Sequence, residues 1–307
     1  MSTLYSTMAC PYAHRAMLAL ELRPVRHLRH DSTSITTANQ FSVVDRIGLS
    51  HGDTLGMLGM HAGKTADGMH ARKEAFKRDV NPTGEVPSLL LASGSVICES
   101  EIVCEYLDAI SDSDSLRLTP AEPLAAARVR MAMKRFNEVP GALVALLKNQ
   151  DVARDGALAA AVDSALSKFL VSIDMDAQFC FEGGACTLAD VHVAPFVYRF
   201  NVVLAHYRGY HLTSRHPRLG RLLRAMESLP QWSAVLSPPD QAYPPITERS
   251  LIGLYAAYAN NNCWADGADG LALAGRGVSH CLSSGMTSTC TTAITQPAET
   301  LKRQRAE

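Results

Sequence analysis

The feature that most constrains the fold of this chain is a Cys-Pro pair between a strand-like run and a helix. Thr3 to Ala9 reads as a short strand, and Cys10 and Pro11 open a helix that continues to Leu22. Proline is favoured at the first helical position, because its missing N–H would be unpaired there anyway. A thiol at a helix N-terminus faces unpaired N–H groups and the positive end of the helix dipole, which favour the thiolate. The pattern predicts a reactive sulfur, although a lone cysteine is more commonly a small buried apolar residue.

Composition places the chain among ordinary globular proteins and excludes several functions. The chain has 307 residues, of which 47% are hydrophobic, and this is enough for two domains with large cores. Its formal net charge is -1, so the composition gives no support for the basic patch that a nucleic-acid partner would require. No apolar run is long enough to cross a membrane and no signal pattern opens the chain, so we expect no stable membrane insertion. The eight cysteines form no C-x-x-C pair and no zinc spacing, so we expect free thiols, no metal and a cytoplasmic location.

The first third of the chain predicts a mixture of strands and helices. Val25–His30 alternates apolar with basic residues and predicts the second strand, after which residues 31–79 lack periodicity and read as an insertion. Apolar runs at Ser88–Leu91 and Ser95–Cys98 flank a Ser-Gly turn and predict a hairpin. A helix follows over residues 100–110, with Ser100 as its N-cap. The resulting order of strands and helices is that of a thioredoxin-like domain.

Further along, the pattern becomes helical and then loses its apolar period. We therefore expect a thioredoxin-like α/β domain over residues 1–110, a linker over 111–123 and an all-α domain over 124–262. Within the last of these, Thr187–Asp190 has the spacing of a capping box at a helix start. Residues 263–307 are rich in Ala, Gly, Ser and Thr and are expected to be a disordered tail.

Four segments, in this order, resemble the glutathione transferase superfamily and within it the cysteine-type, omega-like class. These segments are Cys10–Arg15, Asn81–Pro87, Glu99–Asp108 and Thr187–Asp190. The resemblance runs from residue 1 to about residue 260, apart from the insertion. It implies an N-terminal domain that binds glutathione, a helical domain that completes the acceptor pocket, and a homodimer.

The resemblance also implies roles for individual residues. Cys10 would form a mixed disulfide with the sulfur of glutathione, the cosubstrate. Val86 would pair its backbone with the cysteinyl part, with Pro87 in the cis form, and an extended peptide can bind there as an added strand. Glu99 and Ser100 would hold the γ-glutamyl end, since a helix N-terminus offers N–H donors to a carboxylate and Glu99 can accept from the ammonium.

The position three residues after Cys10 is Ala13, so a second thiol for dithiol exchange is missing. This favours a monothiol thiol transferase or reductase that acts on small disulfides, dehydroascorbate-like or glutathionylated acceptors. One alternative is a conjugating transferase, in which Tyr12 or Ser6 activates the thiol of glutathione and an electrophile is the acceptor. Tyr12 is in either case a candidate glutathione contact. Another alternative is a non-catalytic, interaction or channel-type relative.

Glu85 departs from the pattern of the family, in which many relatives carry a lysine just before the Val-Pro pair. The change removes a cation expected near the glycyl carboxylate of glutathione, so weaker binding or a thiol with a cationic tail becomes an alternative. Basic residues of the insertion are possible substitutes for that cation: His61, Lys64, Lys73 and Lys77.

Other polar and sulfur-containing residues receive simpler interpretations. Cys98 and Cys104 are expected to be structural, and His192 and His206 have no partner at metal-ligand spacing. Four further side chains are candidates for the acceptor pocket, with plain packing as the alternative: Tyr198, Arg199, Tyr207 and Tyr210.

Overall fold

A computed structural model describes residues 2–7, 10–23, 25, 41–45, 74–111, 117–237 and 245–260. The N-terminal part contains a four-stranded sheet in the order β2-β1-β3-β4. Its strands are β1 (Ser2–Ser6), β2 (Phe41–Asp45), β3 (Ser88–Leu90) and β4 (Val96–Ile97). Strand β1 pairs in parallel with β2 and antiparallel with β3, and β3 and β4 form the expected hairpin.

The parallel partner of β1 is β2 and not the predicted strand at Val25–His30. Leu4 is opposite Val43 in the parallel ladder, and β2 contains two consecutive valines, which favour extended backbone. Of the predicted segment, the structure describes Val25 alone, buried and outside a strand. Alternation of apolar and basic residues is compatible with a strand, but pairing across a crossover depends on contacts far apart in the sequence. Part of the segment interpreted as an insertion, residues 41–45, therefore belongs to the sheet.

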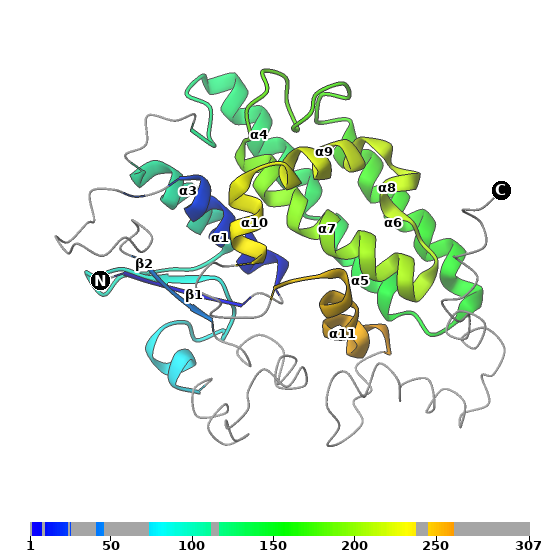
Figure 1. The fold of residues 1–307 in the computed structure, drawn as a ribbon, viewed down its shortest axis with the longest axis horizontal. Coiled ribbons are helices and arrows are strands. Elements are labelled where there is room, and N and C mark those ends of the chain that lie inside the picture. The colour runs from blue at the N-terminus through cyan, green and yellow to red at the C-terminus, as the bar shows by residue number, and fades with distance from the viewer. Residues whose placement is uncertain are drawn as a thin grey trace, which may run out of the picture.

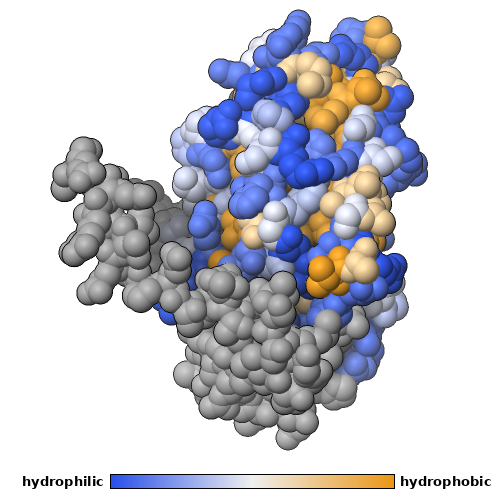
Figure 2. Space-filling view, turned by 90° about the vertical axis from the view of Figure 1, so that its right-hand side faces the viewer, coloured by the Kyte–Doolittle hydropathy of each residue, from blue (hydrophilic) through white to orange (hydrophobic). Residues whose placement is uncertain are grey.

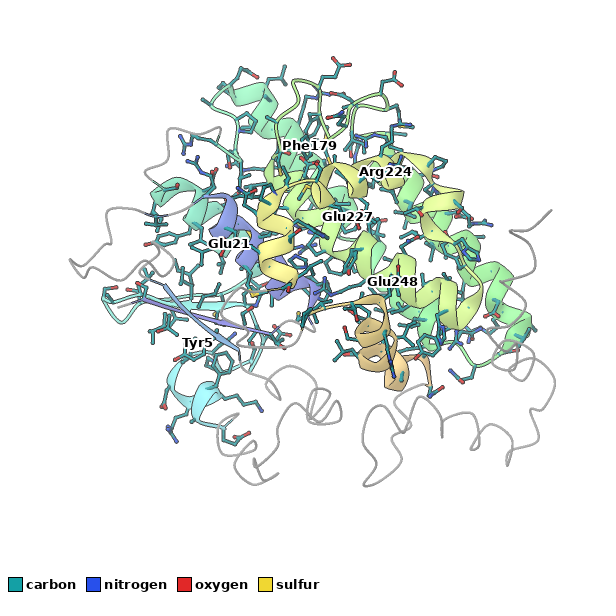
Figure 3. The ribbon with its side chains drawn as sticks, in the orientation of Figure 1. Tyr5, Glu21, Phe179, Arg224, Glu227 and Glu248 are labelled. Atoms are coloured by element: carbon teal, nitrogen blue, oxygen red, sulfur yellow. The ribbon has the colours of Figure 1, made fainter. Side chains whose placement is uncertain are left out.

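Two helices cover one face of the sheet, and a short helical segment over residues 74–79 lies against the other (Figure 1). The pair consists of α1 (Pro11–Leu22) and α3 (Ser100–Ile110), whose buried side chains meet those of Leu4 and Leu89. On the opposite face, Tyr5 projects from β1 toward the short segment, with its ring 5.2 Å from that of Phe76 (Figure 3). Apolar residues on both faces of the sheet thus hold this layer together.

A buried ion pair connects the ends of these two helices to the following segment. Arg23 Nε lies 3.0 Å from Asp108 Oδ1, and both side chains are almost fully buried. The Asp108 carboxylate also accepts from the backbone N–H groups of Leu118 and Thr119. Because Asp108 has a cationic partner and accepts two backbone hydrogen bonds, its buried charge is compensated.

The rest of the described chain is helical, in agreement with the predicted all-α region. Its elements are α4 (Pro123–Phe136), α5 (Val139–Lys148), the 3₁₀ turn η2 (Val152–Arg154), α6 (Asp155–Leu170), α7 (Leu188–Arg208), α8 (Leu212–Arg215), α9 (Pro217–Glu227), α10 (Pro230–Leu236) and α11 (Glu248–Ala259). Helix α4 begins at Pro123, the last residue of the predicted linker. The boundaries of the domains stay predictions, and the predicted tail lies outside the described residues.

Helix α7 runs through the middle of the helical region (Figure 1). The predicted capping box is present at its start, where the Asp190 carboxylate accepts from the Thr187 N–H and hydroxyl and from the Cys180 N–H. In the part of the chain that is described, α7 is also the one helix with the length and composition to cross a membrane, yet 78% of that window is buried in the fold. The core position of α7 accounts for its apolar character.

The surface of the described residues is largely polar on the face shown in Figure 2, with hydrophobic residues gathered in smaller groups among the hydrophilic ones. Most large apolar side chains instead lie in one core cluster that extends from α1 through α7 to α11. This shared core joins the sheet-containing part to the helical part, and it positions the cavity described next.

Candidate active site

A cavity of about 940 Å³ opens between the sheet-containing part and the helical part. The N-terminal side of its wall is formed by Cys10, Pro11, Tyr12, Arg15, Asn81, Glu85, Val86, Pro87, Glu99, Ser100, Glu101 and Ile102. The helical side is formed by Asn137, Pro140, Gly141, Val144, Leu147, Phe196, Phe200, Leu254, Tyr255 and Tyr258. All six predicted site residues therefore lie in one wall, opposite a largely apolar and aromatic one.

Cys10 is the N-cap residue of α1, as the sequence predicts. Its φ and ψ angles of -89° and 122° are those of extended backbone, and its C=O accepts from the His14 N–H at 3.0 Å. The sulfur is partly buried beside Ala13 and Val86, and the thiol donates to the Val86 C=O over 3.9 Å. The reactive atom thus lies at the mouth of the helix, next to the backbone predicted to receive a peptide.

Opposing influences act on the Cys10 thiol, and burial is the largest. Burial raises the pKa of Cys10 above its ordinary value of 9.0, whereas the Tyr12 and Ala13 N–H groups and the Arg199 and Arg15 guanidinium groups lower it. The helix N-terminus and Arg15 lower the pKa, as predicted, but burial, which the sequence did not reveal, outweighs them and the net direction is upward. The helix end supplies the expected donors, but loss of water costs the anion more.

The Val86–Pro87 peptide bond is cis, as the resemblance implied. Asn81 holds the preceding loop, since its amide group donates to the Glu85 C=O and to Ser88 Oγ at 3.0 and 3.1 Å. Among the described residues no hydrogen bond reaches the Val86 N–H. A buried backbone N–H without a partner is rare, and Val86 lines a cavity in which a ligand can supply an acceptor. This edge fits an extended peptide-like group.

At the start of α3, Glu99 and not Ser100 is the N-cap residue, which corrects the prediction by one position. Glu99 has a φ of 66°, which is uncommon for a residue other than glycine and occurs at ligand-binding sites. Ser100 is the first helical residue, and its hydroxyl accepts from Arg15 Nη1 at 3.1 Å. Glu99 and Ser100 nevertheless both line the cavity, as predicted.

Arg15 is a cation buried within the cavity wall. Its guanidinium lies between two aromatic rings, 4.9 Å from the centre of Tyr12 and 4.7 Å from that of Phe196. Its Nε donates to the His192 C=O at 2.9 Å, and burial lowers its pKa to about 10. Arg15 Nη2 has no hydrogen-bond partner in the described part of the chain. Arg15 therefore supplies positive charge beside Ser100 and connects α1, α3 and α7.

A second polar connection crosses the same wall. The Asn137 amide donates to Glu101 Oε1 at 2.8 Å, and its carbonyl oxygen lies 2.9 Å from His192 Nε2. Burial lowers the pKa of His192 well below 6.5, so the ring is neutral and its Nε2–H donates to Asn137. The carboxylate of Glu101 is thereby fixed at the junction of the two parts.

Arg199 approaches the site from α7, beneath the first turn of α1. Its Nη1 lies 2.8 Å from His14 Nδ1, and both side chains are fully buried. Burial and the charge of Arg199 lower the pKa of His14 well below 6.5. A neutral His14 accepts from Arg199, so the added positive charge near Cys10 comes from the two arginines and not from His14.

The sequence identified the N-terminal wall of the cavity better than the helical wall. The four candidates Tyr198, Arg199, Tyr207 and Tyr210 do not line the cavity. Their places are taken by residues that the prediction missed: Asn137, Phe196, Phe200, Leu254, Tyr255 and Tyr258. Tyr255 and Tyr258, three positions apart on α11, are a helical aromatic pair that could have drawn attention.

The two candidate activators of the thiol of glutathione occupy different environments. Tyr12 lines the cavity and is 42% exposed, whereas Ser6 is fully buried and lies outside the wall. Burial of its ring raises the pKa of Tyr12, so its hydroxyl stays protonated. Ser6 is thereby excluded as a contact within the cavity. Within the described residues, no group of three or more His, Cys, Asp and Glu side chains could hold a metal ion.

Comparison with known proteins supports a family assignment for this chain. The family described as "Glutathione S-transferase, N-terminal domain" matches residues 9–110, which include Cys10, Val86 and Ser100. Mouse (Mus musculus) glutathione S-transferase omega-1 is 23% identical over 200 residues, which cover 65% of this chain and 67% of the relative. Residues 9–110 thus match the N-terminal domain of glutathione transferases, and the longer similarity to the curated relatives supports membership of that superfamily. Its similarity within the superfamily is to the omega-like class, as the sequence indicated.

Solved structures agree on the fold of this chain. Glutathione transferase Omega 3C from Trametes versicolor has a TM-score of 0.59 at 20% identity, over 85% of this chain and 91% of that one. Dehydroascorbate reductase from Chlamydomonas reinhardtii has a TM-score of 0.50 at 18% identity, over 84% and 98%. These matches confirm the thioredoxin-like N-terminal domain and the helical C-terminal domain. The curated omega-class relatives support an enzyme of the glutathione transferase type.

Proposed function

We propose that the protein is a glutathione-dependent thiol transferase and reductase in which Cys10 forms a mixed disulfide with glutathione. The observation that carries the proposal is the position of Cys10 as the N-cap of α1, 3.9 Å from the carbonyl of the cis-bonded Val86 and inside the cavity. Glutathione would lie along this wall, with its cysteinyl backbone paired to Val86 and its γ-glutamyl end at Glu99 and Ser100.

The chemistry requires one thiol of the protein and two sulfur exchanges. The Cys10 thiolate attacks the glutathionyl sulfur of a disulfide R–S–S–G, the S–S bond breaks, and the R–S⁻ leaving group takes a proton to become R–SH. A second glutathione thiolate then attacks the glutathionyl sulfur on Cys10. That step releases glutathione disulfide and regenerates the Cys10 thiolate. The sum converts R–S–S–G and glutathione into R–SH and glutathione disulfide.

Several properties of the wall support these exchanges. The Tyr12 and Ala13 N–H groups and the Arg199 and Arg15 guanidinium groups act to lower the pKa of Cys10, so each favours the thiolate as leaving group in the second exchange. The apolar wall opposite leaves room for the R group of the acceptor. Small disulfides, glutathionylated compounds and dehydroascorbate-like molecules are the proposed acceptors.

The proposal is tested by reduction of a small glutathionylated disulfide, with glutathione as the only reductant, by the wild type and by Cys10→Ser. We expect the variant to lose at least about 100-fold in kcat/KM, because removal of the nucleophile removes the covalent route. Cys98→Ser is the matched control, since Cys98 is partly buried at the end of β4 and does not line the cavity. It should retain near wild-type activity.

The same variants distinguish the conjugating alternative. If Cys10→Ser keeps the reductase activity, the monothiol mechanism is wrong. If the variant loses the reductase activity but conjugates glutathione to an aryl halide, the cavity binds glutathione, and Cys10 alone determines which of the two reactions occurs. An inactive wild type would instead favour the non-catalytic, interaction or channel-type alternative. A cytoplasmic location and a homodimer stay predictions.

A further inference from the structure

We propose that Glu85 makes this site prefer a glutathione-type thiol with a masked glycyl carboxylate over glutathione with a free carboxylate. In such a thiol the glycyl carboxylate is an amide or carries an attached amine. The inference rests on the proposed function, because it takes the thiol to lie along Val86. It goes further by assigning the chemical class of the tail and the residue that discriminates it.

The position of the tail follows from the pairing at Val86. A peptide that adds as an antiparallel partner places its next residue opposite the preceding residue of the protein. When the cysteinyl residue is opposite Val86, the glycyl residue is therefore opposite Glu85. The γ-glutamyl end then extends the other way, toward Pro87 and the N-terminus of α3, where Ser100 and Arg15 lie. The pairing of the cysteinyl residue with Val86 thus fixes the positions of both the glycyl end and the γ-glutamyl end of the thiol.

The side chain that meets the tail is a carboxylate. Glu85 is exposed and lines the cavity. The Thr83 hydroxyl donates to Glu85 Oε2 over a long 3.5 Å. No cation among the described residues pairs with this carboxylate at the position opposite the glycyl residue, and His61, Lys64 and Lys73 lie outside those residues. Two carboxylates in adjacent positions repel each other, whereas an amide can donate to Glu85 and an ammonium can pair with it.

The nearby described cations do not reverse this effect. Lys77 packs its side-chain stem against Gly84, where an added Cβ would lie 2.9 Å from Lys77 Cε, and its ammonium group is 3.6 Å from Glu74. Lys77 does not line the cavity. Arg15, the one Lys or Arg side chain among the described lining residues, is engaged with Ser100 at the γ-glutamyl end.

The described residues that line the cavity carry a net negative charge, which has the same sign as the charge of Glu85. Three glutamates line the cavity, Glu85, Glu99 and Glu101, against the single guanidinium of Arg15. A thiol with one ammonium and two carboxylates carries a net negative charge, and masking the glycyl carboxylate makes it neutral. The wall therefore favours the masked form by its overall charge as well as by the contact at Glu85.

The test is equilibrium binding, which does not depend on turnover. Isothermal titration calorimetry would compare S-methylglutathione with the same compound carrying a glycyl amide. We expect the wild type to bind the amide about tenfold more tightly, Glu85→Gln to bind both about equally, and Glu85→Lys to prefer the free carboxylate. Added salt should reduce the wild-type preference. Glu182→Gln is the matched control, since it removes an exposed carboxylate outside the cavity and should keep the wild-type ratio.

Two negative outcomes have different meanings. If the ratio of the affinities for the amide and the free carboxylate is the same in the wild type and in Glu85→Lys, the inference alone is overturned, because both ligands still bind at the proposed site. Absence of binding by either ligand, in the wild type and in all the variants, overturns the proposed glutathione site and the inference with it.

Discussion

Cys10 combines a favourable backbone position with an unfavourable degree of burial. The N-terminus of α1 directs two N–H groups at the sulfur, and two buried arginines add positive charge. Desolvation outweighs them, and the thiol donates to the Val86 carbonyl in the protein without a ligand. A thiol partner that pairs with Val86 would compete for that carbonyl. Burial thus favours the thiol over the thiolate at Cys10.

The pH dependence of alkylation tests this description. Because the pKa of Cys10 is raised, less thiolate is present at neutral pH than in a free cysteine, and the thiolate fraction is still increasing as the pH passes 9.0. We expect the rate of Cys10 alkylation by iodoacetamide to increase through 9.0 without levelling off below it. Peptide mapping assigns the rate to Cys10, and Cys10→Ser gives the background. A rate that levels off well below the ordinary thiol pKa would show that the N–H groups and arginines dominate.

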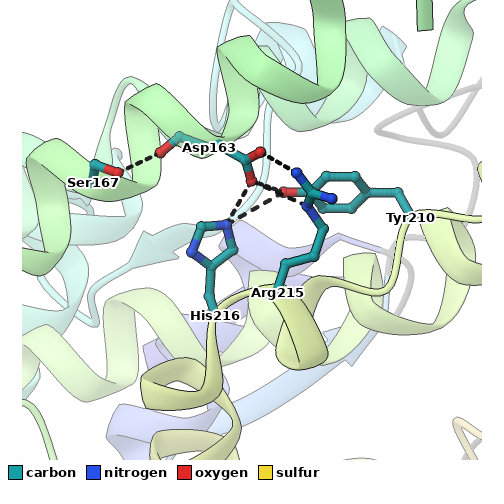
Figure 4. A network of polar contacts seen from close by, with 5 residues as sticks. All are labelled: Asp163, Ser167, Tyr210, Arg215 and His216. Carbon is teal, nitrogen blue, oxygen red and sulfur yellow. Dashed lines mark hydrogen bonds and ion pairs between the residues drawn. The ribbon is translucent and has the colours of Figure 1, made fainter. Parts of the chain in front are cut away.

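Among the helical elements, α6 is fastened to the segment around α8 by one carboxylate. Asp163 on α6 accepts from the Tyr210 hydroxyl at 2.7 Å, from the Arg215 guanidinium, and lies 2.8 Å from His216 Nε2 (Figure 4). These hydrogen bonds hold the pKa of Asp163 well below its usual value of 3.8, and the one from Arg215 has the largest effect. The ionised carboxylate is therefore part of the folded structure.

Replacement of this carboxylate should weaken the packing of α6. Asp163→Asn keeps the shape but loses the charge-assisted bonds, and we expect the free energy of unfolding at neutral pH to fall by about 1–3 kcal/mol. Since the folded-state pKa is lowered, the stabilisation is complete above 3.8 and is lost as the pH falls through the lower folded value. The variant should lack this acid-dependent loss.

Urea denaturation of the wild type and variant at neutral and acidic pH measures both effects. Asp176→Asn, which removes an exposed aspartate, is the control. Equal free energies of unfolding of Asp163→Asn and the wild type at neutral pH would mean that the hydrogen bonds of Arg215 and Tyr210 to the carboxylate do not stabilise the fold.

The sequence was most informative where an element is defined by its own residues. Pro11 after Cys10, the Ser-Gly turn between β3 and β4, and the Thr187–Asp190 capping box are local signals, and each predicted element is present. Strand β2 was misplaced because its choice depends on the edge of β1, which offers a partner to any suitable extended segment. Local pattern and propensity do not decide between such segments.

The candidate site shows the same division. The Cys10, Val86 and Ser100 segments were recognisable, but the acceptor wall was not, because Tyr255 and Tyr258 reach the cavity only through the packing of α11. The direction of the pKa of Cys10 was also missed. It depends on burial by residues distant in the sequence, which the first turn of a helix does not reveal.

At the scale of the whole molecule, the site exists because two parts share one core. The sheet-containing part supplies the sulfur and the peptide-binding edge, and the helical part supplies the opposite wall. Arg15 joins the two parts through its hydrogen bond to the His192 C=O, and Asn137 joins them through its hydrogen bond to Glu101. A ligand that occupies both walls can therefore bring its sulfur to Cys10 while its remainder lies against apolar and aromatic side chains.

The measurement that tests the central claim most directly is the intact mass of the full chain after incubation with glutathione disulfide, followed by peptide mapping. The account predicts one glutathione per chain, attached to Cys10, removed by added glutathione and absent in Cys10→Ser. The Cys98→Ser control should be modified like the wild type. An unmodified Cys10, or a glutathione that attaches to another cysteine while Cys10 stays free, would contradict the monothiol mechanism.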